Sequence, residues 1–176
     1  MLNNDLSQQI KRNFPYKPTE EQENAVKSFA EFLFSPSADS VFLMKGYAGT
    51  GKTTLTSALV CTLDSLQRKV ILLAPTGRAA KVFSGYAEHP AYTIHKKIYR
   101  QKVFSNETDN FVANQNLHRN TLFIVDEASM IANEGLSGGH FGSGRLLDDL
   151  VQYVYNGLGC RLMLIGDTAQ LPPQSG

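Results

Sequence analysis

The chain is poor in cysteine, and this argues against two kinds of protein. Its 176 residues contain two cysteines, Cys61 and Cys160, which lie far apart, without a C-x-x-C spacing or a neighbouring pair of histidines. A disulfide framework and a cysteine-based metal site both need more cysteines at closer spacing. We therefore expect a reduced, cytoplasmic protein that has no structural metal.

Long hydrophobic runs and an excess of one charge are missing as well. No apolar run approaches the length of a membrane span, and the N-terminal residues MLNNDLSQQIKRNF lack the apolar segment of a signal peptide. We therefore expect no membrane association. The formal net charge is +1, so no overall basic field points to nucleic acid. Any nucleic-acid binding must come from local groups.

What the sequence does contain indicates one globular α/β domain. Hydrophobic residues make up 42% and charged residues 19%, which is typical of a soluble folded chain. Apolar runs of strand length occupy residues 41–44, 70–74, 121–125 and 161–165, and helical patterns lie between them. Because these runs are apolar on both faces, they predict a parallel sheet with helices on both sides.

The most informative stretch is VFLMKGYAGTGKTT, residues 41–54. An apolar run is followed by Gly46, Gly51, Lys52 and Thr53 at the spacing G-x-x-x-x-G-K-[ST], which is that of a phosphate-binding loop between a strand and a helix. Glycines let successive backbone N–H groups approach a polyphosphate closely. Lys52 is expected to reach the β- and γ-phosphates, and the Thr53 hydroxyl to ligate Mg²⁺.

An acidic pair follows the apolar run at residues 121–125. Asp126 and Glu127 stand at the end of this predicted strand, where carboxylates are costly to bury without a cation beside them. Magnesium on a nucleotide is such a partner, so we expect Asp126 to hold the metal and Glu127 to orient or deprotonate an attacking water. The alternative is an exposed acidic strand end.

Gln22 has two interpretations. The run Thr19-Glu20-Glu21-Gln22 predicts a helix over residues 20–34 with Thr19 as its N-cap, and Gln22 then stands at the position that completes a capping box. Alternatively, its carboxamide reads the edge of an adenine. The spacing by itself favours the cap.

Two further segments carry candidate ligand contacts. Pro75, Thr76, Gly77 and Arg78 follow the predicted strand at 70–74, and in open α/β sheets such loops lie beside ligands. Residues 93–97, with Thr93 and His95, combine hydroxyl, imidazole and cationic groups. The alternative for this second segment is a solvated loop and helix edge.

Three other stretches carry structural expectations only. Residues 101–120 are polar with scattered apolar residues and predict a hairpin or an excursion, and the glycine-rich residues 135–144 predict a flexible loop. Leu146, Leu147, Leu150, Val151 and Val154 predict an amphipathic helix that ends at Asn156-Gly157.

Taken together, the motifs resemble those of the first motor domain of a superfamily 1 DNA helicase, closest to the RecD-like and Dda-like 5′-to-3′ branch. The matching segments are Gln22, residues 46–54, residues 74–80, residues 93–95, Asp126-Glu127-Ala128-Ser129 and residues 166–173, GDTAQLPP. They occur in the order found in that family. The last two are much more specific than a phosphate loop alone.

The resemblance implies a RecA-like P-loop NTPase fold in which the strand before residues 166–173 lies between those leading to Gly46 and to Asp126. It implies ATP and Mg²⁺ as cofactors and single-stranded DNA as a partner. It also changes the balance for Gln22 toward an adenine contact, which is compatible with capping its helix, and it makes Gln170 a sensor of the γ-phosphate. The expected catalytic residues are Lys52, Glu127 and Gln170, and those of the metal site are Thr53 and Asp126. The residues expected to bind ATP are Gln22, Gly46, Gly49, Thr50, Gly51, Lys52, Thr53 and Thr54, and those expected to bind DNA are Pro75, Thr76, Gly77, Arg78, Thr93 and His95.

The resemblance also implies a second RecA-like domain that supplies arginines to the γ-phosphate. No residues that match this domain occur among residues 1–176, so we expect the chain to be the N-terminal motor domain of a longer helicase. Two other functions stay open: a phosphotransferase of the nucleotide-kinase type, and a nucleotide-dependent binding module without unwinding activity. The acidic pair and Gln170 suit water activation better than transfer to a small acceptor.

Overall fold

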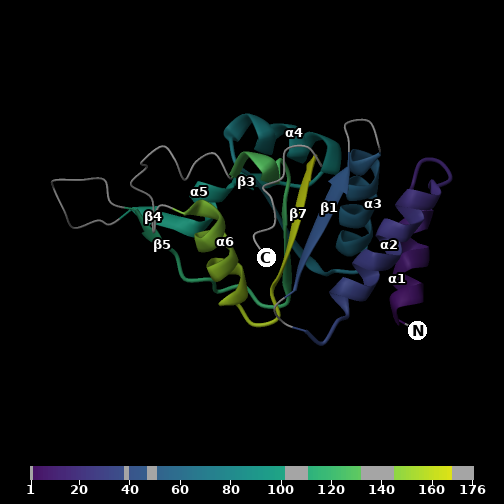
Figure 1. Cartoon of the computed structure of the whole chain (residues 1–176), viewed down its shortest axis with the longest axis horizontal. Coiled ribbons are helices and arrows are strands. Elements are labelled where there is room, and N and C mark those ends of the chain that lie inside the picture. Colours follow the sequence, from purple (N-terminus) through teal and green to yellow (C-terminus); the bar gives the residue numbers. More distant parts are fainter. Residues whose placement is uncertain (1, 38–39, 47–50, 102–110, 132–144, 168–176) are drawn as a thin grey trace.

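The computed structural model describes residues 2–37, 40–46, 51–101, 111–131 and 145–167. In these ranges helices and strands alternate along the chain, as Figure 1 shows. The helices are α1 (Leu2–Arg12), α2 (Glu20–Leu33), α3 (Lys52–Ser65), α4 (Gly77–Ala87), α5 (Ile94–Ile98) and α6 (Leu146–Tyr155). The strands are β1 (Val41–Gly46), β2 (Lys69–Ala74), β3 (Ala91–Thr93), β4 (Tyr99–Gln101), β5 (Phe111–Ala113), β6 (Thr121–Val125) and β7 (Arg161–Asp167).

Five of these strands form one parallel sheet in the order β1-β7-β6-β2-β3. The strand before residues 166–173 therefore lies between the strands that lead to Gly46 and to Asp126, as predicted. The fold class, a RecA-like parallel sheet with helices on both faces, is confirmed. In a parallel sheet all strands end at the same edge, so this order brings the loops after β1, β6 and β7 together.

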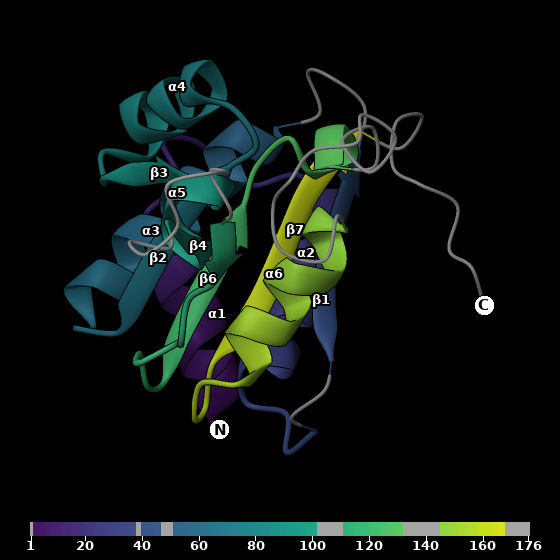
Figure 2. The ribbon, with the colours of Figure 1, turned by 90° about the vertical axis from the view of Figure 1, so that its left-hand side faces the viewer.

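Side chains alternate between the two faces of the sheet and form two separate cores. In β6, Leu122 and Ile124 pack with α1, α2 and α3, whereas Phe123 and Val125 pack with α5 and α6. All four are buried, which explains why β6 reads as a continuous apolar run rather than as an alternating one. Figure 2 shows α6 on one side of the sheet and α1 on the other.

Helix α1 is a feature that the sequence analysis did not predict. Its composition is polar, but Leu6 and Ile10 are four residues apart and are both buried against α2 and α3. Phe14, four residues further on, is also buried. An apolar stripe only one residue wide is enough to dock a helix but too weak a pattern to identify one in the sequence.

Helix α2 begins as predicted. The Thr19 hydroxyl accepts a hydrogen bond from the Gln22 backbone N–H at 3.2 Å, and the Gln22 side chain accepts one from the Thr19 N–H at 2.9 Å. Both bonds of the capping box are present. The helix ends at Leu33, one residue before the predicted end.

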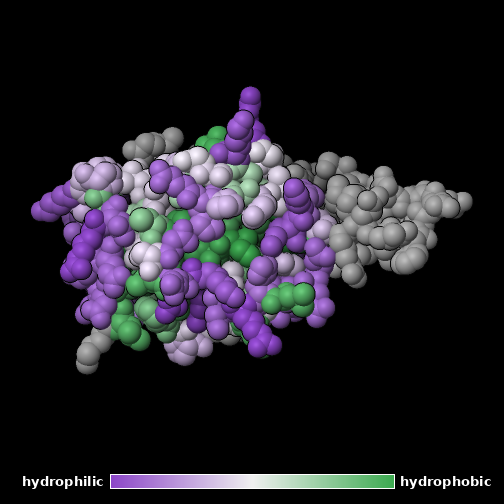
Figure 3. All heavy atoms as spheres, turned by 180° about the vertical axis from the view of Figure 1, so that it is seen from behind, coloured by the Kyte–Doolittle hydropathy of each residue, from purple (hydrophilic) through white to green (hydrophobic). Residues whose placement is uncertain are grey.

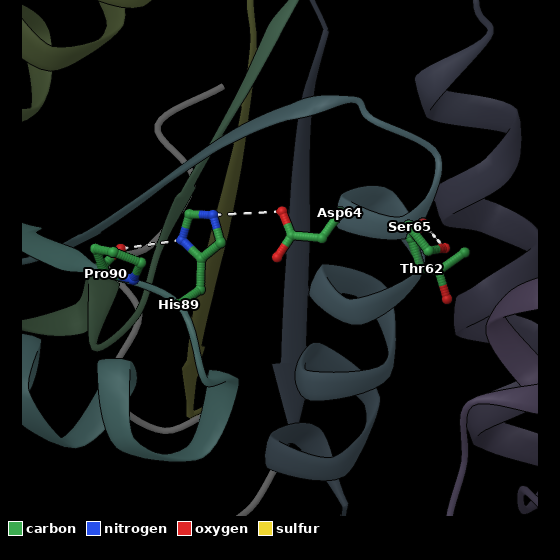
Figure 4. A network of polar contacts seen from close by, with 5 residues as sticks. All are labelled: Thr62, Asp64, Ser65, His89 and Pro90. Atoms are coloured by element: carbon green, nitrogen blue, oxygen red, sulfur yellow. Dashed lines mark hydrogen bonds and ion pairs between the residues drawn. The ribbon is translucent and has the colours of Figure 1, made fainter.

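The segment that follows α4 is tied to α3. The His89 Nε2 atom lies 3.4 Å from Asp64 Oδ1, and the Nδ1 atom lies 3.1 Å from the carbonyl oxygen of Pro90 (Figure 4). On the α3 side, the Ser65 hydroxyl donates to the Thr62 carbonyl, close to the end of the helix. The His89–Asp64 contact joins the last turn of α3 to the turn that leads into β3.

The expectations for residues 101–120 and 135–144 differ in outcome. For residues 101–120 the expectation is a hairpin or an excursion; Tyr99–Gln101 and Phe111–Ala113 form an antiparallel pair, which favours the hairpin. The glycine-rich residues 135–144 lie outside the described residues. The amphipathic helix predicted after them is α6, which ends at the cap residue Asn156.

The described helices are all too short or too polar to cross a bilayer. Seen from behind, most of the coloured surface is hydrophilic, and hydrophobic atoms show between the polar ones near the middle of this face (Figure 3).

Candidate functional site

A pocket of about 630 Å³ opens at the edge of the sheet where the strands end. It is lined by the start of α3, the ends of β6 and β7, one side of α4 and Tyr16. The lining residues are Tyr16, Gly51, Lys52, Thr53, Thr54, Thr56, Val82, Tyr86, Asp126, Glu127, Ile165 and Gly166. Lys52 and the acidic pair, 74 positions apart in sequence, therefore face the same space.

Lys52 is held between the ends of two neighbouring strands. Its Nζ atom donates hydrogen bonds to the carbonyl oxygen of Gly46 at 2.7 Å and to that of Gly166 at 3.3 Å. Gly46 ends β1, and Gly166 lies near the end of β7. The ammonium group is thereby fixed at the pocket wall, and α3 directs its N-terminal end toward the same space, where the helix dipole favours an anion.

Gly51 is required by its conformation and by a close neighbour. Its φ angle is +84°, in the left-handed region, and a Cβ atom built there would overlap the Nε2 atom of Gln22. Glycine meets both conditions without strain. Thr53 and Thr54 follow in the first turn of α3 and line the pocket. Gly49 and Thr50 lie outside the described residues.

Gln22 connects α2 with the start of α3. Its side chain is 4% exposed; Oε1 accepts the capping bond from Thr19, and Nε2 donates to the Gly51 carbonyl at 3.2 Å and to the Tyr16 hydroxyl at 3.4 Å. The capping interpretation is thus confirmed. The adenine contact stays a prediction, although the position beside Gly51 puts this carboxamide next to the pocket.

Asp126 is held by hydrogen bonds to both carboxylate oxygens. Oδ2 accepts from the Tyr86 hydroxyl at 2.6 Å, and Oδ1 accepts from the Glu127 backbone N–H at 2.8 Å. The residue is half-buried at the pocket wall. This arrangement is not that of a freely exposed strand end.

Glu127 follows in an unusual backbone conformation. Its φ angle is +54°, although it is not a glycine, and its side chain is exposed at the pocket. Left-handed conformations cost a non-glycine residue free energy and cluster at functional sites. The backbone here keeps Asp126 and Glu127 beside the same pocket.

Two tyrosines of the pocket were missed in the sequence analysis. Burial, together with the nearby negative charges of Asp126 and Glu127, raises the pKa of Tyr86 well above its usual value. Tyr16 is affected in the opposite direction, because hydrogen bonds from Gln22 and Thr54 lower the pKa of its hydroxyl. Neither tyrosine stands at a recognisable motif spacing, so only the fold reveals its place.

The two candidate DNA-contacting segments lie side by side. Ala74 at the end of β2 pairs with Thr93 at the end of β3, so Pro75 to Arg78 and Thr93 to His95 leave the sheet together. The Thr76 hydroxyl caps α4 by accepting from the Ala79 N–H, and the Thr93 hydroxyl caps α5 by accepting from the Lys96 N–H. Gly77 and Arg78 are exposed in the first turn of α4.

For residues 93–97 the alternative is a solvated loop and helix edge; the segment is a partly exposed helix edge and not a loop. It contains the end of β3 and most of α5, and Ile94 is fully buried. His95 is half-buried, and its ring lies 5.7 Å from that of Tyr99. The segment is therefore a fixed part of the sheet edge.

The donor set of the pocket fits magnesium held together with a phosphate. Within the described ranges, no three histidine, cysteine, aspartate or glutamate side chains gather to hold a metal by themselves. The pocket instead offers the Thr53 hydroxyl and the Asp126 carboxylate. Mg²⁺ is usually bound by one or two protein oxygens together with substrate phosphates and water.

Gln170, the third expected catalytic residue, lies outside the described residues. The strand that precedes it does reach the site, since Ile165 and Gly166 of β7 line the pocket. The predicted convergence of strand ends is therefore observed for β1, β6 and β7.

The chain is similar in sequence to a known helicase. The ATP-dependent RecD2 DNA helicase of Deinococcus radiodurans is 33% identical over 132 residues, which cover 74% of this chain and 16% of that helicase. The chain thus spans a small part of the curated relative that it matches.

Two solved structures share the fold. The large terminase of bacteriophage HK97 matches 93% of this chain and 37% of its own with a TM-score of 0.57 and 10% identity. The Pif1 helicase of Candida albicans matches 90% of this chain and 34% of its own with a TM-score of 0.50 and 21% identity.

A family described as an AAA domain matches residues 17–174. This range contains the phosphate loop, the acidic pair and both candidate DNA segments. The chain therefore belongs to this AAA-domain family, and its P-loop domain is a RecA-like motor domain of the superfamily 1 helicase type.

Proposed function

We propose that the chain is the ATP- and single-stranded-DNA-binding motor domain of a DNA helicase of the 5′-to-3′ branch. In this proposal it hydrolyses ATP to drive movement along one strand, together with a second RecA-like domain of a longer protein. The observation that carries the proposal is the single pocket in which Lys52, Thr53, Asp126 and Glu127 meet. The likeness to a protein named as an ATP-dependent DNA helicase supports it.

Several residues in and beside the pocket have a part in the proposed reaction. Lys52 contributes a fixed positive charge for the β- and γ-phosphates, and the backbone N–H groups at the start of α3 are expected to bind them as well. Thr53 and Asp126 hold Mg²⁺, which when bound neutralises negative charge that develops on the phosphate oxygens. Gln22 contacts the adenine edge beside Gly51.

Glu127 serves as the general base in this proposal. Its exposed carboxylate faces the pocket beside Asp126, where it can orient a water and accept its proton. Gln170 bridges the γ-phosphate and the DNA site, because a carboxamide both donates and accepts hydrogen bonds.

The DNA strand runs along the loops after β2 and β3. Arg78 and the backbone amides of the first turn of α4 contact phosphates, while Thr93 and His95 lie on the neighbouring segment. Such contacts carry little sequence preference, which suits a motor that moves along any strand.

The test is the effect of DNA on phosphate release by the full-length protein. We expect hydrolysis of ATP to rise severalfold or more with single-stranded DNA and to be unaffected by a nucleoside monophosphate. Displacement of a labelled strand should require a 5′ single-stranded tail. Release of phosphate that ignores DNA and depends on a small acceptor would instead identify a phosphotransferase.

A non-catalytic binding module is the second candidate for the chain by itself. It is favoured by the share of the relative that is matched, since 16% of that helicase cannot contain all of its parts. Binding of ATP by residues 1–176 without measurable turnover, with or without single-stranded DNA, would establish this alternative for the isolated chain.

A further inference from the structure

We propose that Tyr86 is a positioning residue, which fixes the Asp126 carboxylate and ties it to the helix that carries the candidate DNA contacts. This inference rests on the proposed function, because it gives the site a physical link between DNA and the metal-holding carboxylate. Tyr86 belongs to none of the motifs in the sequence.

The link is a short hydrogen bond across the pocket wall. The Tyr86 hydroxyl donates to Asp126 Oδ2 at 2.6 Å, and the other oxygen, Oδ1, accepts from the Glu127 N–H at 2.8 Å. Two donors on two different oxygens determine the plane of the carboxylate. Each carboxylate oxygen can accept a second interaction, so Asp126 can still bind magnesium or one of its waters.

The tyrosine is itself fixed in place. Its ring stacks on that of Phe83, with ring centroids 5.3 Å apart, and Phe83 is completely buried. Both residues belong to α4, which packs on α3, β2 and β3. The hydroxyl therefore moves with the body of the helix rather than as a free side chain.

The same helix begins at the candidate DNA contacts. Thr76 caps α4, and Gly77 and Arg78 form its exposed first turn, whereas Tyr86 stands in its last turn. A helix transmits a displacement along its length, because its backbone hydrogen bonds keep it rigid. A shift of the first turn when DNA binds would thus change the position of the donor to Asp126. The carboxylate would respond without any contact to the DNA.

Partners that orient a metal ligand commonly change metal affinity or activity by about 10- to 100-fold when they are removed. The test variant is Tyr86→Phe in the full-length protein, which keeps the ring on Phe83 and removes the hydroxyl. The measurement is equilibrium binding of fluorescent ADP, with Mg²⁺ and with EDTA. We expect affinity without metal to change less than about twofold, and the gain from Mg²⁺ to fall by about tenfold.

Tyr153→Phe is the matched control. Tyr153 is a buried tyrosine of α6 that packs on Phe123 and does not line the pocket, so its variant should bind ADP as the wild type does in both conditions. Asp126→Asn should remove most of the gain from Mg²⁺, and adding Tyr86→Phe to it should change little more, because both substitutions act on one interaction.

Coupling to DNA is read from the same binding assay. If a single-stranded oligonucleotide changes the affinity for Mg²⁺–ADP in the wild type, this change should shrink in Tyr86→Phe and persist in Tyr153→Phe. An equal gain from Mg²⁺ in wild type and Tyr86→Phe overturns the inference. A variant that does not fold also overturns it. So does a variant whose ADP affinity falls by the same factor with EDTA as with Mg²⁺, because the hydroxyl then serves the fold.

These outcomes are separate from failure of the proposed function. A wild-type protein that binds no nucleotide, or whose binding ignores Mg²⁺, refutes the nucleotide site itself. If ADP binding by the wild type depends strongly on Mg²⁺ and binding by Tyr86→Phe depends on it equally, only the role of Tyr86 is refuted.

Discussion

At the scale of single residues, the position of Lys52 suits the phosphate-binding role proposed for it. The ammonium group is anchored on the carbonyls of Gly46 and Gly166 at the pocket. Both acceptors are backbone carbonyls of neighbouring strands, and the lysine lines the pocket. In the proposed function its charge serves the ligand.

Lys52→Ala should abolish productive nucleotide binding and leave the fold intact. Loss of charge-assisted hydrogen bonds to phosphate is expected to weaken binding by at least about 10- to 100-fold, while the unfolding temperature falls by only a few degrees. Titration with fluorescent ATP and thermal unfolding provide the two readouts. Lys27→Ala, an exposed lysine on α2, is the control and should change neither.

Glu127→Gln should separate binding from hydrolysis. The amide keeps the size of the side chain but cannot accept a proton, so turnover is expected to fall by about 10² to 10⁴ while the affinity for ATP is retained. Single-turnover hydrolysis by the full-length protein measures this. Full activity in the variant would show that another group is the base.

At the scale of elements, the contact between α2 and the start of α3 depends on one glycine. Gly51→Ala should both strain the loop and displace Gln22, since the new Cβ atom overlaps its amide and the φ angle is +84°. The left-handed conformation alone costs about 1–2 kcal/mol for alanine. We expect a lower unfolding temperature and weaker nucleotide binding.

Gly85→Ala, the same substitution at a position inside α4, is the control. No atom lies within 4 Å of a Cβ atom built at this position in α4, and its backbone is helical. Alanine is favoured over glycine inside a helix by about 0.5–1 kcal/mol, so this variant should be equally or more stable. Equal destabilisation by both substitutions would contradict the role assigned to Gly51.

Helix α1 should contribute to stability through its narrow apolar stripe. Ile10 is 0% exposed and Leu2 is 67% exposed on the same helix. Ile10→Ala is therefore expected to lower the free energy of unfolding by about 2–5 kcal/mol, whereas Leu2→Ala should change it by less than about 0.5 kcal/mol. Chemical denaturation of both variants measures the difference, and similar losses would mean that α1 does not dock as described.

At the scale of the whole molecule, the sheet order explains how a pocket forms from distant segments. Because β7 lies between β1 and β6, residues near positions 46, 126 and 166 reach one place. In the proposed function a second domain closes over this edge, and this chain supplies one wall of the site.

The isolated chain should therefore bind ATP weakly and hydrolyse it very slowly. Arginines supplied to the γ-phosphate from another domain are worth about 10³ to 10⁵ in rate in related nucleotidases. Steady-state phosphate release by residues 1–176 and by the full-length protein, at equal concentration with single-stranded DNA, gives the comparison. Equal rates would contradict the need for a second domain.

Much of the site could be predicted because its chemistry is local in sequence. The phosphate loop needs Gly51, Lys52 and Thr53 in succession, and the acidic pair must follow a buried strand, so short patterns identify both. Tyr86 could not be found in this way. Its bond to Asp126 spans 40 positions and exists only because α4 packs beside the end of β6.

The sequence by itself determined the class of the fold, several of the residues that line the pocket and the Thr19 cap of α2, because periodicity, glycine and short polar motifs act through near neighbours. The tertiary structure decided which segments meet: the docking of α1, the bond from Gln22 to Gly51, the pairing of β2 with β3 and the hold of Tyr86 on Asp126. These depend on packing between residues far apart in the chain. No local pattern specifies such contacts until the sheet brings their partners together.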